Sequence, residues 1–292
     1  MAYSAQYPDL TLCRVALQEK GTYQLLGPTG AQWARVSGKF QFEAKTVSDY
    51  PAVGDYVMAD LNGGDTAVIH AVLPRTSAFQ RKAAGTSKSE QVVAANIDTL
   101  FICMSLNNDF KLRRLERYLT VAWDSGATPV LLLTKADLCP DVAAKISRAR
   151  EVAAGVDILA TSALEKDGYR AIQPYLIPGK TLAFIGSSGV GKSTLINALL
   201  GEDRLETNGL REGDRGRHTT THRELIVLPG GTMVIDTPGM RELGMWDVGE
   251  GFSAAFADNP AFRIPSAYSR STARRAPPGN SRPLPQTSRR SS

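Results

Sequence analysis

The sequence is poor in the features that mark secreted and membrane proteins. Its 292 residues include only three cysteines, Cys13, Cys103 and Cys139, which are far apart and lack metal-ligand spacing. This pattern fits a reducing compartment. No apolar run approaches the roughly 20 residues that span a bilayer, and residues 1–14 lack the basic start and apolar stretch of a signal peptide. We therefore expect a cytoplasmic monomer with no membrane partner.

Neither acidic nor basic residues dominate the chain. Hydrophobic residues make up 42% of the sequence and charged residues 22%, as in ordinary globular proteins. The length allows one large domain and one small one. A net charge of +5 is compatible with a nucleic-acid partner but does not require one.

Residues 1–75 consist of short apolar segments separated by glycines. Strands are expected at 23–26, 34–36, 40–42, 56–59 and 67–72. Closely spaced strands without a convincing helix predict a small β-barrel, although another small β-sheet domain would fit as well. Residues 76–91 are expected to be a linker.

Residues 92–250 alternate between buried-strand and helix patterns. Strands are expected at 97–106, 129–133, 156–160 and 181–185, with a hairpin at 224–236. Helices are expected around 112–122, 141–154 and 191–200, and Gly126 can end the first of them. The alternation predicts an α/β domain with a mainly parallel sheet and helices on both faces. Ligands of such domains bind at the carboxyl ends of the strands.

The end of the chain has a different composition. Residues 263–292 are rich in Ser, Pro and Arg and contain no acidic residue. Such a segment cannot bury enough apolar surface to offset its chain entropy. We therefore expect a disordered basic tail over residues 251–292.

One segment has the pattern of a phosphate-binding loop between a strand and a helix. Its sequence is Gly186-Ser187-Ser188-Gly189-Val190-Gly191-Lys192-Ser193-Thr194. In this pattern the glycines let backbone N–H groups surround phosphate oxygens, and the helix N-terminus adds favourable partial charge. Lys192 is expected to reach the β- and γ-phosphates, and the Ser193 hydroxyl to bind Mg²⁺.

A second segment has the chemistry needed to distinguish guanine from adenine. It is Thr134-Lys135-Ala136-Asp137, at the end of an expected strand. The Asp137 carboxylate can accept two hydrogen bonds from guanine, whereas adenine would leave it unpaired. Lys135 would pack over the base. Many guanine sites have Asn at the position of Thr134. Ser162-Ala163-Leu164 would contact the guanine oxygen through backbone N–H groups.

Two further segments are expected to complete the phosphate site. In Asp236-Thr237-Pro238-Gly239, Asp236 can hold Mg²⁺ through water and Gly239 can donate its N–H to the γ-phosphate. The loop at 216–221 can supply a Mg²⁺-binding threonine, for which we favour Thr220 over Thr219. A polar surface loop is the simpler alternative for the second segment.

If the bound nucleotide is hydrolysed, a side chain must orient the water molecule that attacks the γ-phosphate. Many GTPases place Gln after the Asp-x-x-Gly motif, but this chain has Met240, which cannot donate a hydrogen bond. His218 is our candidate, because it lies two residues before Thr220 and an imidazole can accept a hydrogen bond near neutral pH. A histidine that only orders the loop is the alternative.

These segments occur in a permuted order, with the guanine segments before the phosphate segments. In this order the chain, from about residue 10 to 257, resembles the ribosome small subunit-dependent GTPase A (RsgA) family. The resemblance rests on the segments above and on Ala94-Ala95-Asn96-Ile97-Asp98, Arg117-Tyr118-Leu119 and the continuation of the 236–239 motif to Leu243. Pro51-Ala52-Val53-Gly54-Asp55 and Arg75-Thr76-Ser77 fit the N-terminal domain and linker of that family.

The resemblance implies a circularly permuted P-loop GTPase domain over 92–250, preceded by an OB-fold barrel over 1–75. It also implies GTP hydrolysis stimulated by the small ribosomal subunit, late in the maturation of that subunit, with the subunit and its rRNA as partners. GTP, GDP and Mg²⁺ are the expected ligands.

The sequence departs from the family near its end. The family carries a C-terminal zinc domain with three cysteines and a histidine, but here no cysteine follows Cys139 and no histidine follows His222. We expect no zinc site, and a truncation or frameshift would produce such a tail. Two alternatives stay open: a nucleotide-dependent RNA-binding module without significant turnover, and a nonfunctional truncated product.

Overall fold

The computed structural model describes residues 6–62, 64–82, 90–107, 109–163, 165, 168–205 and 223–236. Most of its strands join one 11-stranded sheet in the order β10-β9-β8-β11-β13-β12-β1-β2-β3-β5-β4. Within the described residues, no helix is both long and apolar enough to cross a membrane.

The N-terminal strands close into a barrel. Its strands are β1 (Thr11–Glu19), β2 (Thr22–Gly27), β3 (Gly30–Val36), β4 (Tyr56–Asp60) and β5 (Ala67–Val72). The order β1-β2-β3-β5-β4 is closed by pairing of β1 with β4, and only the β3–β5 pair is parallel. Alternate side chains such as Val15, Leu25 and Ile69 fill the barrel interior. This five-stranded arrangement confirms the predicted OB-fold barrel.

Two parts of the barrel differ from the sequence prediction. The predicted strand at 40–42 is wrong, because helix α2 (Gly38–Glu43) occupies these residues. The Ser37 hydroxyl accepts a 3.1 Å hydrogen bond from the Phe40 amide and caps the helix. Strand β1 was not predicted, although it is the longest strand of the barrel.

The segment expected to be a linker contains regular structure. Strands β6 (Ala78–Lys82) and β7 (Glu90–Ala95) form an antiparallel two-stranded sheet. Val53 of the barrel makes an isolated bridge with Ala94. Beside it, Gly54 has φ +89°, and a Cβ there would lie 2.2 Å from the Ala95 carbonyl oxygen. Glycine therefore permits the close approach of these two backbones.

The second part of the large sheet is mainly parallel, as predicted. Four strands run in parallel: β8 (Thr99–Ser105), β9 (Thr128–Thr134), β10 (Asp157–Ala160) and β11 (Thr181–Ile185). Next to β11 lies β13 (Met233–Asp236), which is parallel to it and forms a hairpin with β12 (Glu224–Val227). The carboxyl ends of β9, β11 and β13 thus meet at one edge of the sheet.

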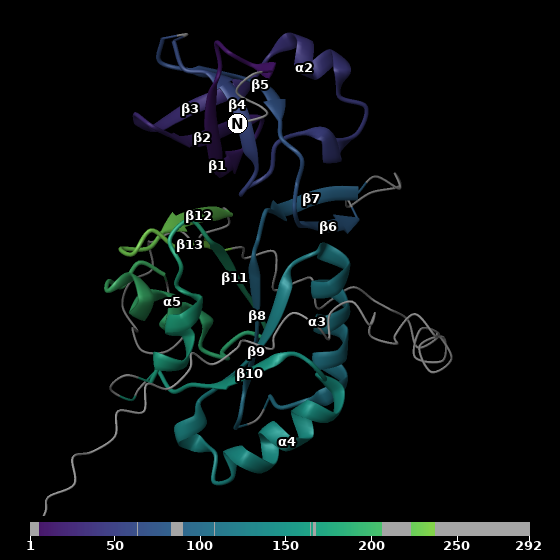
Figure 1. Cartoon of the computed structure of the whole chain (residues 1–292), viewed down its shortest axis with the longest axis vertical. Helices are drawn as coiled ribbons and strands as arrows, with labels where there is room; N and C mark the ends of the chain where they lie inside the picture. Colours follow the sequence, from purple (N-terminus) through teal and green to yellow (C-terminus); the bar gives the residue numbers. More distant parts are fainter. Residues whose placement is uncertain are drawn as a thin grey trace, which may run out of the picture. The chain divides into compact units, whose positions relative to one another are not determined.

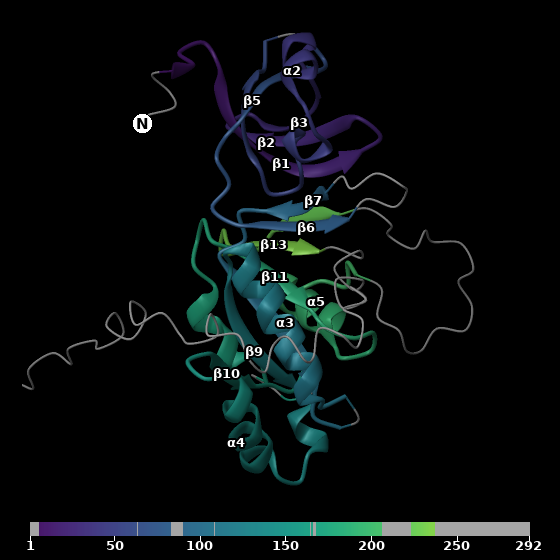
Figure 2. The same cartoon turned by 90° about the vertical axis from the view of Figure 1, so that its right-hand side faces the viewer.

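Helices cover both faces of this parallel sheet, as Figures 1 and 2 show. Helices α3 (Leu112–Ser125) and α4 (Val142–Val152) share one apolar cluster with residues such as Ile102 and Leu131. Helix α5 (Lys192–Leu200) and the 3-10 segment η3 (Arg170–Tyr175) pack on the other face, against Phe101 and Leu132.

Helix ends agree closely with the prediction. Helix α3 ends at Gly126, which has φ +83° in the left-handed region. Asp141 caps α4 by accepting a hydrogen bond from the Ala144 amide.

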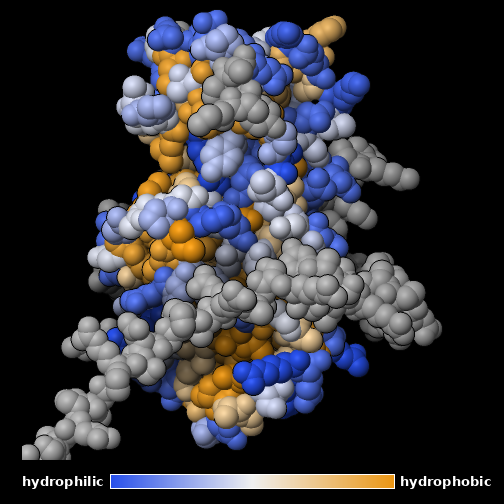
Figure 3. All heavy atoms as spheres, in the orientation of Figure 1, coloured by the Kyte–Doolittle hydropathy of each residue, from blue (hydrophilic) through white to orange (hydrophobic). Residues whose placement is uncertain are grey.

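In the view of Figure 3, hydrophilic and apolar residues are mixed over the surface.

Candidate functional site

The predicted phosphate loop connects β11 to α5. The strand ends at Ile185 and the helix begins at Lys192. Gly186 has φ +146°, and a Cβ there would lie 2.3 Å from the carbonyl oxygen of Cys103 on β8. The loop therefore leaves the sheet through a position that only glycine can occupy.

Lys192 lies across this loop. Its ammonium group donates to the carbonyl oxygens of Gly186 at 2.5 Å and Ser187 at 2.7 Å. Ser188 and Gly189 are exposed, whereas the Val190 side chain is buried in the cluster under α5. Ser193 and Thr194 follow in the first turn of α5, where free backbone N–H groups and the helix dipole favour an anion.

The predicted guanine segment begins at the end of β9. Lys135 has φ +57°, an uncommon conformation for a residue other than glycine. The chain then turns into the 3-10 segment η2 (Ala136–Leu138), which places Asp137 on the surface. The Ala136 amide donates to the Thr161 carbonyl at 3.1 Å, so the turn is fixed to the segment after β10.

A hydrogen bond connects the guanine segment to the phosphate loop. The Thr134 hydroxyl donates to the Val190 carbonyl at 2.6 Å. Thr134 is buried, with 6% of its surface exposed. The two segments that sequence analysis assigned to base and phosphate thus lie side by side.

The third segment of the predicted base site follows β10. Ser162 is 2% exposed, and its amide donates to the Gly168 carbonyl at 3.2 Å. Ala163 is half-buried, while Leu164 lies outside the described residues. The structure therefore brings Ser162 and Ala163 to the same sheet edge as Asp137.

Asp236 ends β13, next to the strand that leads into the phosphate loop, and is half-buried. With the Ser193 hydroxyl it offers an oxygen-donor set. Mg²⁺ in phosphate-binding sites is commonly held by one or two carboxylates together with substrate phosphates, so these residues fit that ion. In the part of the chain that the structure describes, no group of three or more His, Cys, Asp or Glu side chains could hold a metal.

Several predicted residues lie outside the described part of the chain. These are His218, Thr219, Thr220, Gly239 and Met240. Their assigned roles stay predictions.

One neighbour of the phosphate loop is not predicted by any sequence motif. Arg114, on the first turn of α3, donates to the Ser187 hydroxyl and forms an ion pair with Asp109. Nothing in the local sequence distinguished Arg114 from the neighbouring Arg113.

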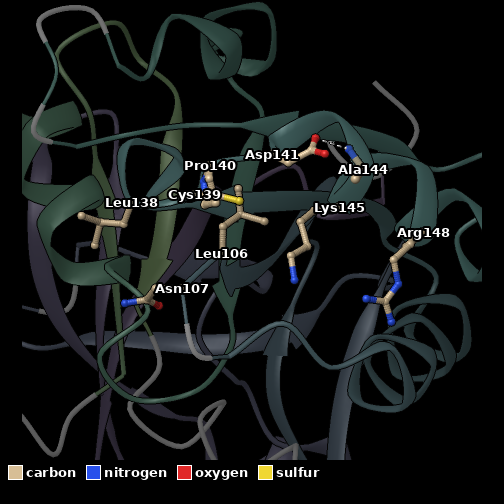
Figure 4. Close-up of a pocket in the computed structure, with 9 residues that line it drawn as sticks. All are labelled: Leu106, Asn107, Leu138, Cys139, Pro140, Asp141, Ala144, Lys145 and Arg148. Atoms are coloured by element: carbon tan, nitrogen blue, oxygen red, sulfur yellow. Dashed lines mark hydrogen bonds between the residues drawn. The ribbon is translucent and has the colours of Figure 1, made fainter.

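A small hollow of about 300 Å³ lies beside the guanine segment, between the loop after β8 and α4. Figure 4 shows its apolar floor at Leu106 and Cys139 and its basic residues Lys145 and Arg148. Both cations also lie over the Phe110 ring, at 4.9 Å and 5.9 Å from its centroid. These residues flank the predicted base site without belonging to it.

The Cys103 thiol is buried in β8, whose backbone the phosphate loop approaches at Gly186. Burial raises its pKa to about 12, and the charge of Lys192 opposes this shift. The thiol is therefore neutral at physiological pH.

Comparison with known proteins gives a family match. The RsgA GTPase family model matches residues 72–246. A small ribosomal subunit biogenesis GTPase, RsgA 2 of Lactiplantibacillus plantarum, is 52% identical over 233 residues, which are 80% of this chain and 66% of the relative. RsgA of Opitutus terrae is 48% identical over 247 residues, 81% of this chain and 67% of the relative. The chain thus spans about two thirds of the length of these curated relatives.

Two solved structures are similar in fold. The structure of YjeQ from Thermotoga maritima aligns with a TM-score of 0.62 and 26% identity, covering 80% of this chain and 76% of that one. The structure of YloQ, described as a circularly permuted GTPase, aligns with a TM-score of 0.59 and 26% identity, covering 80% and 73%. With the family match over more than half of its length, this chain belongs to the RsgA GTPase family.

Proposed function

We propose that this protein binds GTP with Mg²⁺ and hydrolyses it to GDP and phosphate during late maturation of the small ribosomal subunit. The observation that carries the proposal is the hydrogen bond from Thr134 to Val190. It connects the segment suited to guanine with the loop suited to phosphates, as one nucleotide spanning both would require.

In this proposal, the base is read by the residues at the ends of β9 and β10. The exposed carboxylate of Asp137 accepts two hydrogen bonds from guanine, and the stem of Lys135 packs over the ring. The Ala163 N–H would meet the guanine oxygen, while the amides of Ala136 and Ser162 hold these loops in place through the Thr161 and Gly168 carbonyls. Adenine would leave the carboxylate without its donors, which costs roughly 1–3 kcal/mol or more.

The phosphates are held by the loop from Gly186 to Thr194. Its backbone N–H groups and the start of α5 attract the anion. Lys192 is placed at this loop, so its ammonium group can exchange the carbonyls of Gly186 and Ser187 for phosphate oxygens. Ser193, Thr220 and Asp236 would hold Mg²⁺. When bound, the ion would offset the negative charge that develops on the phosphate oxygens.

We assign the orientation of the attacking water to His218. Its imidazole can accept a hydrogen bond from water near neutral pH. The Met240 thioether is only a weak acceptor and cannot donate a hydrogen bond. Gly239 would donate its N–H to the γ-phosphate. These assignments rest on the sequence motifs alone.

The partner and the compartment are inferred from relatives. Relatives that are 52% and 48% identical to this chain are named small ribosomal subunit biogenesis GTPases. We propose the small subunit and its rRNA as partners of this chain, and a cytoplasmic monomer as its form. An OB-fold barrel is a common nucleic-acid-binding module, which supports an RNA partner.

Nucleotide selectivity tests the base assignment. The parent protein should bind GTP at least about tenfold more tightly than ATP, since one unpaired acceptor is worth about 1.4 kcal/mol. Asp137→Asn should shift the preference toward xanthine nucleotides, because an amide can donate to the additional carbonyl. Asp124→Asn, on α3, is the matched control. Equal affinity of the parent for GTP and ATP would refute the proposal.

Turnover separates the GTPase from an RNA-binding module without turnover. Hydrolysis of GTP should be measured with and without small ribosomal subunits. The proposal expects phosphate release that the subunits accelerate and that Ser193→Ala abolishes while some GDP binding remains. Nucleotide binding without any release of phosphate would favour the RNA-binding module.

A further inference from the structure

Helix α3 contacts the phosphate loop at Ser187. Arg114 donates to the Ser187 hydroxyl from the first turn of the helix. Tyr118, one turn later, also lies at this residue: burial raises its pKa, and the charge of Arg114 and a hydrogen bond with Ser187 oppose that shift. Because the Ser187 carbonyl accepts from Lys192 as well, the first turn of the loop is held from two sides.

The charge of Arg114 is balanced within the same cluster. The same guanidinium nitrogen that donates to Ser187 forms an ion pair with Asp109, in the loop before α3. The side chains of Arg114 and Asp109 are only 21% and 20% exposed. The second carboxylate oxygen of Asp109 is buried and has no hydrogen-bond partner among the described residues. The carboxylate of Asp109 therefore needs Arg114 as its ion-pair partner. This ion pair in turn holds the guanidinium of Arg114 at the phosphate loop.

We propose that Arg114 is a positioning residue for the phosphate loop, which holds the first turn of the loop through the Ser187 hydroxyl in the geometry that receives nucleotide phosphates. This inference rests on the proposed function. A phosphate loop binds through several backbone N–H groups at once, so a small displacement of its first turn weakens many hydrogen bonds together. A side chain outside the sequence motif thus sets the affinity for the phosphates.

Arg114 acts through Ser187 in this proposal, and a double-mutant cycle tests that route. The measurement is the Kd of GDP with Mg²⁺ for the full chain, by calorimetry. Arg114→Met should weaken GDP binding about tenfold in the parent. In the Ser187→Ala background, where the hydroxyl is absent, the same substitution should change the Kd by less than about twofold.

Two variants separate this role from general effects of charge or folding. Arg113→Met removes the same charge from an exposed neighbour on α3 and should bind GDP as the parent does. Arg114→Lys keeps a donor near Ser187 and should recover most of the lost affinity. The thermal unfolding midpoint of each variant without nucleotide reports on the fold.

The outcomes distinguish the inference from the function on which it rests. A parent protein that does not bind GDP would refute both. A parent that binds GDP, with Arg114→Met unchanged or equally impaired in both Ser187 backgrounds, would refute the positioning role alone. Should Arg114→Met fail to fold, Ser187→Ala decides: it removes the same contact and should itself weaken GDP binding, and parent-like affinity would overturn the inference.

Discussion

The Thr134 hydroxyl donates a 2.6 Å hydrogen bond to the carbonyl of Val190 and a longer one, 3.4 Å, to the carbonyl of Met104. Thr134 is 56 residues from Val190 in sequence. The hydrogen bond nevertheless joins the first residue of the guanine segment to the middle of the phosphate loop. Many guanine-binding proteins have Asn at this position. Here the shorter hydroxyl makes the connection to the phosphate loop.

Thr134→Val should weaken nucleotide binding without unfolding the protein. Valine has nearly the same shape, so the main loss is one buried hydrogen bond, about 1 kcal/mol, or roughly fivefold in the Kd of GDP. Thr134→Ser keeps the hydroxyl and serves as the control. A Kd for Thr134→Val equal to that of Thr134→Ser would show that the bond to Val190 contributes nothing.

Gly186→Ala should damage the phosphate loop more than an ordinary glycine substitution. The new Cβ would meet the Cys103 carbonyl at 2.3 Å, in addition to the strained φ of +146°. Gly179→Ala is a matched control, since Gly179 has φ +79° but no atom within 4 Å of its Cβ position. We expect Gly186→Ala to cost about 1–3 kcal/mol of unfolding free energy beyond the control, with loss of GDP binding. Urea unfolding measures the difference, and similar costs for the two variants would contradict the steric argument.

Much of the α/β part was predictable because its elements carry strong local signals. The apolar run that became β11 and the glycine-rich loop after it fix where a strand ends and α5 begins. Gly126 ended α3 as expected because glycine readily adopts the left-handed conformation.

The failures in the barrel have physical causes. Strand β1 was missed because its residues do not alternate between inside and outside: Cys13, Arg14, Val15 and Ala16 are all buried. Arg14 in particular gave that segment a polar character. At 40–42 the two phenylalanines suggested a strand, but only Phe40 packs against the barrel, whereas Phe42 is 91% exposed.

The site residues were predicted from sequence motifs. Their neighbours in the folded structure could not be predicted in this way. Arg114 is 73 residues from Ser187 in sequence and contacts it because α3 packs on β8 and β9, next to the strand that leads into the phosphate loop. Such contacts follow from the tertiary fold, which no local pattern encodes.

Alkaline pH should remove part of the stability that Cys103 provides. Its pKa rises from 9.0 to about 12 on folding, so the thiol ionises in the unfolded chain first. The contribution is therefore constant below pH 9 and declines between pH 9 and 12. At pH 10 it should be smaller than at pH 8 by on the order of 1 kcal/mol. The destabilisation caused by Cys103→Ala, measured by urea unfolding, should shrink by this amount, and a pH-independent difference would contradict the assignment.

Arg14 makes the most extensive side-chain contacts of β1. Its guanidinium donates to five acceptors: the carbonyls of Gly54 and Asn96, the hydroxyls of Tyr56 and Thr181, and the sulfur of Met233. Thr181 begins β11, which leads to the phosphate loop, and Met233 begins β13, which ends at Asp236. Only 6% of Arg14 is exposed, and burial lowers its pKa although the nearby Tyr56 and Asp98 raise it.

Arg14→Met should therefore destabilise the protein strongly. Methionine fills a similar volume but leaves buried carbonyl and hydroxyl groups without their donor, at about 1–3 kcal/mol for each group that finds no other partner. We expect a loss of at least about 3 kcal/mol in unfolding free energy. Arg14→Lys should lie between the parent and Arg14→Met, because one ammonium group cannot reach every acceptor of the planar guanidinium. Arg35→Met removes a charge from an exposed position on β3 and should change stability by less than about 0.5 kcal/mol. Urea unfolding of the four proteins tests the ranking, and an Arg14→Met variant as stable as Arg35→Met would show that these hydrogen bonds do not hold β1 to β11 and β13.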